Sequence, residues 1–194
     1  SDPANNRPIS MENLMCKIGE KVVKAEIMEY FTRNNMIRST QHGFMPKKST
    51  TTNLIEYFDD LSRSMDMGQT VCSIYTDYSK CFDRIPHHLL LHKLQTRFNI
   101  GGELLKWIKD WLNNRKQRVV LNGKKSSYNS VTSGVIQGSV SGPVFALVML
   151  DSIDEVIKYG KASKYADDNK IYGIVTNDYE RQLLQDDLNR VKNW

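Results

Sequence analysis

The sequence predicts a mixed α+β fold in which helices pack with an antiparallel sheet. Apolar residues recur at helical spacing in several stretches, which indicates amphipathic helices. Val71–Asp77 is a run of strand-forming residues, and the region around Asp167 has the pattern of two short strands joined by a tight turn. At 194 residues, the chain is long enough to bury a hydrophobic core, as one domain or as two small lobes.

Composition narrows the class of protein. The hydrophobic content of 40% and charged content of 25% are ordinary for a globular protein. The net charge of +5 fits a polyanionic partner, although many basic proteins bind no nucleic acid. The three cysteines form no Cys-x-x-Cys pair, which argues against a zinc site or a disulfide framework and favours a reducing, intracellular location. The longest apolar run, residues 144–150, is too short to span a membrane, so we expect no membrane partner.

The first half of the chain is expected to hold two helices and a strand. The first helix starts near Met11 and continues towards Phe31, with one apolar face made of Leu14, Ile18, Val22 and Ala25. A loop carries residues 41–49. The second helix starts among residues 49–51 and ends at Gly68, with its apolar face made of Leu54, Phe58, Leu61 and Met65. The strand that ends at Asp77 follows.

The second half alternates helices with short strands. Helices are expected over residues 86–97 and 102–114, followed by a hairpin with strands at 117–122 and 128–135 around a turn at 123–125. Residues 140–159 form a helix that tolerates Pro143 in its first turn. A final helix follows the acidic hairpin and has an apolar face made of Leu184, Leu188, Val191 and Trp194.

Two acidic positions are candidates for chemistry. Asp167 and Asp168 are adjacent, and adjacent side chains on a strand point to opposite faces, so the sequence predicts a turn at residues 167–169 that lets both carboxylates converge. Such a pair alone is more often a solvated turn. Asp77, at the end of a strand, would complete a carboxylate cluster that suits Mg²⁺. Two such ions about 3.5–4 Å apart would clamp the oxygens of a phosphoryl transfer.

Five motifs together resemble the reverse transcriptase of a non-LTR, jockey-like retrotransposon. Two resemble its fingers, and three resemble its palm. The fingers motifs are Arg-Pro-Ile-Ser at 7–10 and Gln-His-Gly-Phe-Met-Pro-Lys-Lys-Ser-Thr at 41–50. The first palm motif is Tyr-Thr-Asp at 75–77 with Lys-Cys-Phe-Asp at 80–83. The other two are Gly-Val-Ile-Gln-Gly-Ser-Val-Ser-Gly-Pro at 134–143 and Tyr-Ala-Asp-Asp at 165–168.

The resemblance implies a right-hand polymerase with an antiparallel palm sheet. Residues 1–69 would be fingers-like and residues 70–194 palm, with an insertion at 98–133. The implied activity is RNA-directed DNA synthesis from a deoxynucleoside triphosphate (dNTP) onto a DNA primer, along an RNA template, with Mg²⁺ or alternatively Mn²⁺. Asp77, Asp167 and Asp168 would hold the metals and carry catalysis. The dNTP-binding residues would be Arg7, Lys47, Lys48, Tyr78, Phe82, Gln137 and Gly138.

Each of these residues also has a plain structural interpretation. The cations at 7, 47 and 48 fit solvated charges, and residues 137–143 fit a turn before a helix. Phe82 is expected in a loop between the strand that ends at Asp77 and the next helix. It fits a core position, whereas the resemblance makes it a steric gate that rejects a 2′-hydroxyl. Asp83 is expected to cap the helix that follows it.

The chain also departs from the family pattern. Cys81 replaces the usual alanine, and residues 150–153 replace the usual Asn-Asp-Leu. The later palm motifs and the thumb would follow Trp194, so we expect a fragment without a thumb. Alternatives to an active polymerase are a non-catalytic nucleic-acid-binding remnant and a scaffold for protein interactions.

Overall fold

In the computed structural model, which describes residues 9–78 and 80–194, the chain folds as two compact units. One contains residues 1–36 and 80–149 and is called the helical unit. The other contains residues 37–79 and 150–194 and is called the sheet unit. Both units are discontinuous in sequence, so they do not follow the boundary predicted at residue 69, and the fingers and palm assignment stays a prediction.

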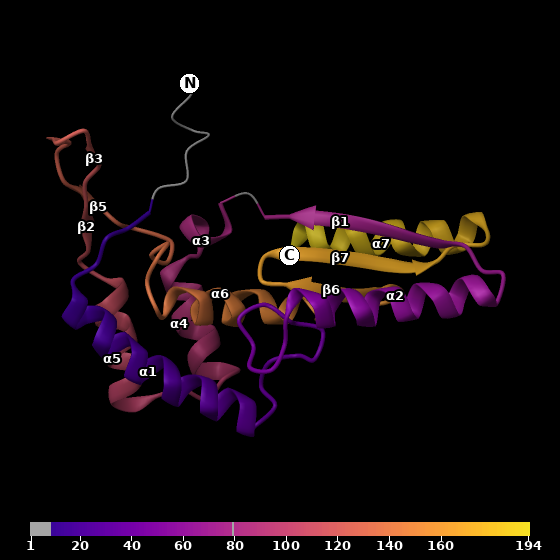
Figure 1. The fold of residues 1–194 in the computed structure, drawn as a ribbon, viewed down its shortest axis with the longest axis horizontal. Helices are drawn as coiled ribbons and strands as arrows, with labels where there is room; N and C mark the ends of the chain where they lie inside the picture. The colour runs from indigo at the N-terminus through magenta and orange to yellow at the C-terminus, as the bar shows by residue number, and fades with distance from the viewer. Residues whose placement is uncertain (1–8, 79) are drawn as a thin grey trace. The chain divides into compact units, whose positions relative to one another are not determined.

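A three-stranded antiparallel sheet forms the centre of the sheet unit (Figure 1). Its order is β1 (Val71–Asp77), β7 (Asp168–Ile174) and β6 (Lys161–Tyr165). Val71 lies opposite Ile174 at one end of the β1–β7 ladder, and Asp77 lies opposite Asp168 at the other. The last residue of β1 and the first of β7 therefore share one end of the sheet.

Helices cover both faces of this sheet (Figure 1). On one face, Ile171 of β7 packs with Leu184 and Val191 of α7 (Asp178–Asn193) and with Ile153 of the 3₁₀ helix η2 (Asp151–Glu155). Asn177 caps α7 by accepting a hydrogen bond from the amide of Glu180. The predicted final helix is confirmed, because the apolar positions 184 and 191 lie in the core.

On the other face, α2 (Thr50–Asp66) contacts the sheet through polar side chains. Its N-terminus is at the predicted place, where Ser49 and Thr52 form a reciprocal capping box. The predicted packing face is wrong, because Leu54, Phe58 and Met65 are exposed while Asn53 and Tyr57 are buried. The Tyr57 hydroxyl hydrogen-bonds Ser73 at 2.7 Å, and its ring lies edge-on to Tyr172 at 5.0 Å. Partners on the sheet therefore decide which side of α2 is buried.

In the part of the chain that the structure describes, the helical unit is formed by α1 (Leu14–Arg33), α3 (Cys81–Arg84), α4 (His87–Thr96), α5 (Gly102–Leu112) and α6 (Gly142–Leu150), of which only Leu150 falls in the sheet unit. Aromatic pairs connect distant helices, with Phe31 4.8 Å from Phe98 and Trp111 5.3 Å from Phe145 between ring centroids. The predicted face of α1 is wrong, because Leu14, Ile18 and Val22 are exposed. The helix is buried instead through Glu20, Ile27, Met28 and Phe31.

The predicted hairpin after α5 is broken into two short ladders. β2 (Lys116–Gln117) pairs with β5 (Asn129–Ser130), and β3 (Val120–Leu121) pairs with β4 (Lys124–Lys125). The turn lies at Asn122 and Gly123, which both have positive φ, one residue earlier than predicted. Every residue from 116 to 130 is exposed, and the segment, here called the β-arm, projects from the helices of its unit (Figure 1).

Three smaller predictions are also corrected. The helix predicted over residues 140–159 ends at Leu150, where the chain continues as η2. Residues 81–84 form the short helix α3 instead of a loop. Asp83 lies within α3, and α4 has Pro86 at its N-cap without a side-chain cap.

Over the described residues, none of the helices combines the length and the apolar character that crossing a bilayer requires.

Candidate active site

Asp77 and Asp168 lie directly opposite each other at the end of the sheet. Because side chains on paired residues share a face, both carboxylates point to the side that also carries Tyr75 and Lys170. Both aspartates are exposed. Like charges at directly opposed positions destabilise a sheet, so this pair needs a neutralising partner.

The turn beside these acids is displaced by one residue from the prediction. Tyr165 pairs with Asp168, so the two loop residues are Ala166 and Asp167, and Asp168 is already in β7. Ala166 has a φ of 58°, a left-handed conformation that costs about 1–2 kcal/mol in a residue with a Cβ. Asp167 is half-buried beside the opposed pair. The convergence of acids therefore comes from strand register as well as from the turn.

Gln41 holds this strained turn through its buried side chain. Its Oε1 accepts hydrogen bonds from the amide groups of Ala166 at 2.9 Å and Gly43 at 2.8 Å, and its Nε2 donates to the Ala166 carbonyl at 3.2 Å. A Cβ on Gly43 would lie 2.1 Å from the Ala166 nitrogen, so no larger residue fits against the turn. The Gln-His-Gly motif thus contacts the acidic hairpin directly.

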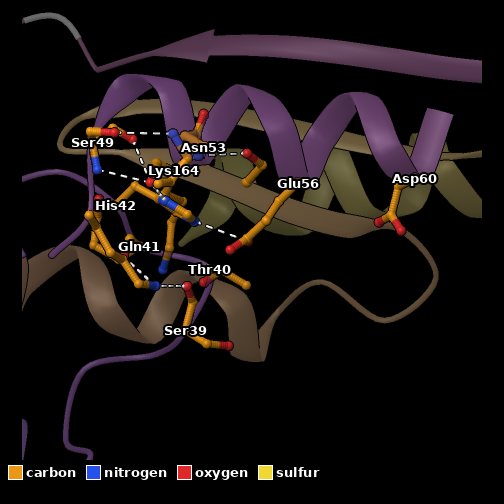
Figure 2. Close-up of polar contacts among 12 residues, drawn as sticks. Ser39, Thr40, Gln41, His42, Ser49, Asn53, Glu56, Asp60 and Lys164 are labelled. Carbon is orange, nitrogen blue, oxygen red and sulfur yellow. Dashed lines mark hydrogen bonds and ion pairs between the residues drawn. The ribbon is translucent and has the colours of Figure 1, made fainter. Parts of the chain in front are cut away.

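A hydrogen-bond network joins the same loop to β6 and α2 (Figure 2). The amide of His42 donates to the Lys164 carbonyl, and the amide of Lys164 donates to the Thr40 carbonyl, both at 2.9 Å. The buried His42 ring contacts Thr52 Oγ1 at 2.9 Å and Glu56 Oε2 at 3.1 Å. Burial, followed by repulsion from Lys48, lowers the pKa of His42. The neutral imidazole is therefore the favoured form.

Asn53 joins α2 to both strands of the acidic hairpin. Its Nδ2 donates to Ser163 Oγ at 2.8 Å and to the Lys164 carbonyl at 3.2 Å, and its Oδ1 accepts from Lys170 Nζ at 2.8 Å. Lys170 also lies 5.0 Å from the centre of the Tyr57 ring. These contacts hold a cation on the same sheet face as the acid pair, two residues along β7.

Lys164, in strand β6 of the hairpin, forms a buried ion pair. Its Nζ lies 2.7 Å from Asp154 Oδ1 of η2, and its side chain is fully buried. An ammonium group in such a place requires an opposite charge, because transfer from water is costly. Lys164 therefore links β6 to η2 through its side-chain ion pair, and its backbone forms hydrogen bonds with residues 40 and 42.

The acid pair fits a divalent cation in the chemistry of its ligands. Mg²⁺ prefers carboxylate oxygens, takes one or two from the protein, and keeps water or phosphate as its other ligands. Asp77 and Asp168 supply two from adjacent strands, with Asp167 next to them. Over residues 9–78 and 80–194, no three acidic, histidine or cysteine side chains form a complete group of metal ligands. Water and substrate oxygens would therefore complete the coordination.

The sheet unit holds three of the predicted dNTP-binding residues in different settings. Lys47 is exposed, with a left-handed φ of 61°. Lys48 is half-buried and donates to the backbone carbonyls of Ser39 and, at 3.0 Å, Gln41. The Tyr78 ring packs against the core and lies 6.2 Å from the Trp194 ring centroid. Lys48 therefore stabilises the loop that carries Gln41.

The helical unit brings two predicted nucleotide-binding motifs together. The amide of Ser10, at the end of the Arg-Pro-Ile-Ser motif, donates to the Gln137 carbonyl at 3.0 Å. Gly138 has a φ of 98°, and a Cβ there would lie 3.2 Å from the Ser10 oxygen. Arg7 lies outside the described residues.

The start of α6 already holds an anion from the protein itself. Glu20 of α1 is buried, and its Oε2 accepts hydrogen bonds from the amide groups of Val140 at 2.8 Å and Ser141 at 2.9 Å. Its Oε1 accepts from Trp111 Nε1 at 2.8 Å. Amide groups before a helix attract negative charge, and here a carboxylate of the chain itself satisfies the amides of Val140 and Ser141.

Phe82 lies on α3 and is half-buried. Its carbonyl accepts a hydrogen bond from the Val135 amide at 2.7 Å. Gly134 packs so closely against the Asp83 backbone that an added Cβ would lie 2.6 Å from the Asp83 oxygen. The helix that carries Phe82, the predicted gate residue, is therefore packed against the loop that precedes Gln137.

A cavity of about 390 Å³ lies between α2 and the strands β6 and β7. Its lining includes Glu56, Asp59 and Asp60, with Lys161 paired to Asp60 at 2.8 Å. The lining includes neither Asp77 nor Asp168, so the cavity is not formed by the acid pair.

Sequence reasoning missed Gln41, Gly43, Asn53 and Glu20 as individual residues that support the site. Gln41 and Gly43 belong to the fingers motif at 41–50, in which the resemblance assigns a role only to the lysines. Glu20 and Asn53 are buried helix residues that lie outside the predicted apolar faces of their helices, so helical periodicity gave no signal for them. Only their burial shows their role, since a buried polar side chain needs partners.

The structure is thus an α+β fold with carboxylates at the end of an antiparallel sheet, an arrangement that suits phosphoryl transfer. All 194 residues match the family described as reverse transcriptase (RNA-dependent DNA polymerase), and the chain belongs to this family. It is 28% identical over 173 residues to a probable RNA-directed DNA polymerase from transposon X-element of Drosophila melanogaster, which aligns 86% of this chain and 19% of the relative. It is 26% identical to the RNA-directed DNA polymerase from mobile element jockey of Drosophila funebris, over 100% of this chain and 22% of the relative.

Solved structures support the same fold. Apo telomerase from Candida tropicalis matches with a TM-score of 0.62 at 11% identity, covering 89% of this chain and 33% of that one. Telomerase from Candida albicans, in complex with a fragment of telomeric RNA, matches with a TM-score of 0.59 at 12% identity, over 90% and 32% of the two chains. The predicted jockey-like family and right-hand polymerase fold are confirmed. The chain spans about a fifth of the length of its curated relatives.

Proposed function

We propose that this chain is the catalytic core of an RNA-directed DNA polymerase of a retrotransposon. The observation that carries the proposal is the register that sets Asp77 opposite Asp168, next to the turn residue Asp167. The proposed reaction joins a primer 3′-hydroxyl to the α-phosphate of a dNTP, and pyrophosphate leaves. An RNA template selects the nucleotide.

In this proposal the three aspartates hold the divalent ions, with Mg²⁺ as the expected ion and Mn²⁺ as an alternative. Bound cations would neutralise the opposed carboxylates and supply electrostatic stabilisation of the phosphoryl group. The protein's own contribution is position, because the strand ladder and the Gln41 contacts keep the carboxylates at one end of the sheet. Positioning and electrostatics supply most of the acceleration in phosphoryl transfer.

Replacement of Asp77 tests the proposed activity. Asp77→Asn keeps the shape of the side chain but removes its charge, so incorporation of deoxythymidylate on an oligo(dT)-primed poly(rA) template should fall by about 100-fold or more. Lys192→Gln, an exposed change on α7, is the control and should leave the rate unchanged. Unchanged extension by Asp77→Asn would overturn the assignment. So would the absence of templated incorporation by both the unmodified chain and a longer polypeptide that contains it.

Nucleotide selection is the finer part of the proposal and involves Arg7, Lys47, Lys48, Tyr78, Gln137 and Gly138, with Phe82 as the gate. The support for Phe82 is its bulk and its position five residues after Asp77. Phe82→Val should raise ribonucleotide use relative to deoxynucleotide use by about tenfold, equivalent to ~1.4 kcal/mol of discrimination. Single-nucleotide incorporation with each sugar measures this ratio. A folded, active variant with an unchanged ratio would refute the gate and leave Phe82 as a packing residue.

A further inference from the structure

The net positive charge of the chain is concentrated in one segment. Residues 111–150 contain five Lys or Arg residues and no Asp or Glu. The whole chain has 27 basic and 22 acidic residues, so the rest of the chain carries 22 of each sign and no net charge. All five cations of the segment lie between residues 115 and 125. The +5 charge therefore belongs to the β-arm and its base.

One of these five cations anchors the arm. Arg115, at the base, forms an ion pair with Glu12 at 2.9 Å and lies over the Trp111 ring at 4.8 Å. The amide of Val131 donates to the Arg115 carbonyl at 2.9 Å and closes the base of the arm. This leaves four cations that project with the arm, namely Lys116, Arg118, Lys124 and Lys125.

The four projecting cations lack acidic partners among the residues that the structure describes. They are all exposed, and no carboxylate of the described residues forms an ion pair with any of them. Such a cluster of like charges is unfavourable in a free surface, because it repels itself. A polyanion removes that repulsion and gains the entropy of counterion release.

Aromatic and apolar side chains are interspersed with the cations. The guanidinium of Arg118 lies 4.7 Å from the centre of the exposed Tyr128 ring. Val119, Val120 and Leu121 are also exposed, at 68%, 56% and 69%. Cations mixed with exposed aromatic groups suit unpaired nucleic acid, whose bases are free to stack, whereas the bases of a duplex already stack on one another.

We propose that the β-arm binds single-stranded nucleic acid. Its lysines contact backbone phosphates, and the Arg118–Tyr128 pair packs against unpaired bases. The choice of nucleic acid among polyanions rests on the proposed polymerase function. The β-arm belongs to the helical unit and shares no residue with the acid pair.

Equilibrium binding without nucleotides tests the arm. The probes are a fluorescein-labelled 20-nucleotide oligouridylate and a matched RNA–DNA duplex, measured by anisotropy from low to moderate salt. The arm variant is Lys116→Gln, Lys124→Gln and Lys125→Gln together. The control variant removes the same charge at three exposed helix positions, as Lys21→Gln, Lys109→Gln and Lys192→Gln. Circular dichroism checks that both fold.

The arm variant should bind the single strand about tenfold more weakly. The slope of log affinity against log salt should also fall by about 2, since each lost phosphate contact removes ~0.7. The control should lose less than about threefold and keep its slope. Tyr128→Ala should weaken single-strand binding about fivefold with an unchanged slope, because stacking is lost and charge is not. Tyr179→Ala, also exposed, is its control and should have no effect.

Three results would overturn the proposal. Equal losses in the arm and control variants would mean that binding follows net charge alone. A preference for the duplex without any effect of Tyr128→Ala would show a backbone contact without single-strand recognition. Arm-dependent binding to phosphatidylserine vesicles in place of the oligonucleotide would assign the surface to membranes. Templated incorporation tests the acids separately, so failure of either proposal is seen on its own.

Discussion

At Gln41, one buried amide side chain satisfies three backbone groups on two chain segments. It bonds the loop amide of Gly43 and both the amide and the carbonyl of Ala166. The Ala166 conformation is strained, and strain of this kind persists only where the surroundings enforce it. A single residue of the loop therefore supports the turn that carries Asp167.

Gln41→Met is expected to destabilise the chain by about 2–4 kcal/mol. The apolar side chain fills a similar volume but leaves buried amide and carbonyl groups without partners, at about 1–3 kcal/mol each. Urea unfolding measures the loss. Gln41→Glu is the matched variant, because it keeps the accepting oxygen and loses only the donated bond, yet buries a charge. Wild-type stability in Gln41→Met would show that the turn does not depend on this side chain.

At the scale of the element, α2 shows that a helix is not always buried on its most apolar side. Its sheet contacts are hydrogen bonds and ring contacts from Asn53 and Tyr57, while Leu54 and Phe58 face outward. Tyr57 is buried on Ser73 and Tyr172, and the next residue, Phe58, is 55% exposed. Adjacent aromatic residues thus have opposite environments.

This arrangement predicts opposite responses to two neighbouring substitutions. Tyr57→Ala should cost about 3–4 kcal/mol of unfolding free energy, since it removes a buried ring and its hydroxyl contact. Phe58→Ser should change stability by less than about 0.5 kcal/mol, as exposed positions usually do. Thermal or chemical unfolding of both variants checks the difference. A reversed order, with Phe58 the costlier change, would contradict the packing of α2.

At the scale of the whole molecule, buried titratable groups set the response to pH. Asp187 is fully buried and accepts hydrogen bonds from the amides of Lys158 at 2.7 Å, Tyr159 at 2.9 Å and Gly160 at 2.6 Å. Burial alone would raise its pKa, but these bonds and Arg190 outweigh it, so the pKa lies below the ordinary value of 3.8. His42 has a pKa below 6.5, chiefly because of burial.

Acidification should therefore destabilise the chain in two stages. When folding lowers the pKa of a group, the unfolded state takes up the proton at a higher pH than the folded state does. Each group therefore stabilises the fold fully above its unfolded pKa and loses that effect as the pH falls through its folded pKa. His42 contributes the loss that begins near pH 6.5, and Asp187 the loss that begins near pH 4. Unfolding free energies of the wild type, His42→Gln and Asp187→Asn across this range measure both stages. If the loss of stability near pH 6.5 persists in His42→Gln, or the loss near pH 4 persists in Asp187→Asn, another group causes that loss.

The sequence was enough to predict the family and the positions of most helices and of strand β1. Helices α2, α4, α5 and α7 and strand β1 lie close to where periodicity and turn residues predicted them, because these signals depend on local chain geometry. The three aspartates can be picked out because they stand in recognisable motifs at 75–77 and 165–168, and their role in metal binding stays a prediction. The concentration of charge at residues 115–125 was equally present in the sequence.

The tertiary structure alone decided register and faces. A shift of one residue in the turn reverses which side of a strand a carboxylate occupies, so only the β1–β7 ladder shows that Asp77 faces Asp168. The outward apolar sides of α1 and α2 depend on partners far away in sequence, such as Trp111 for Glu20 and Ser163 for Asn53. Hydrogen bonds to buried polar groups outweigh periodicity there, because an unsatisfied buried group costs more free energy than an exposed apolar side chain.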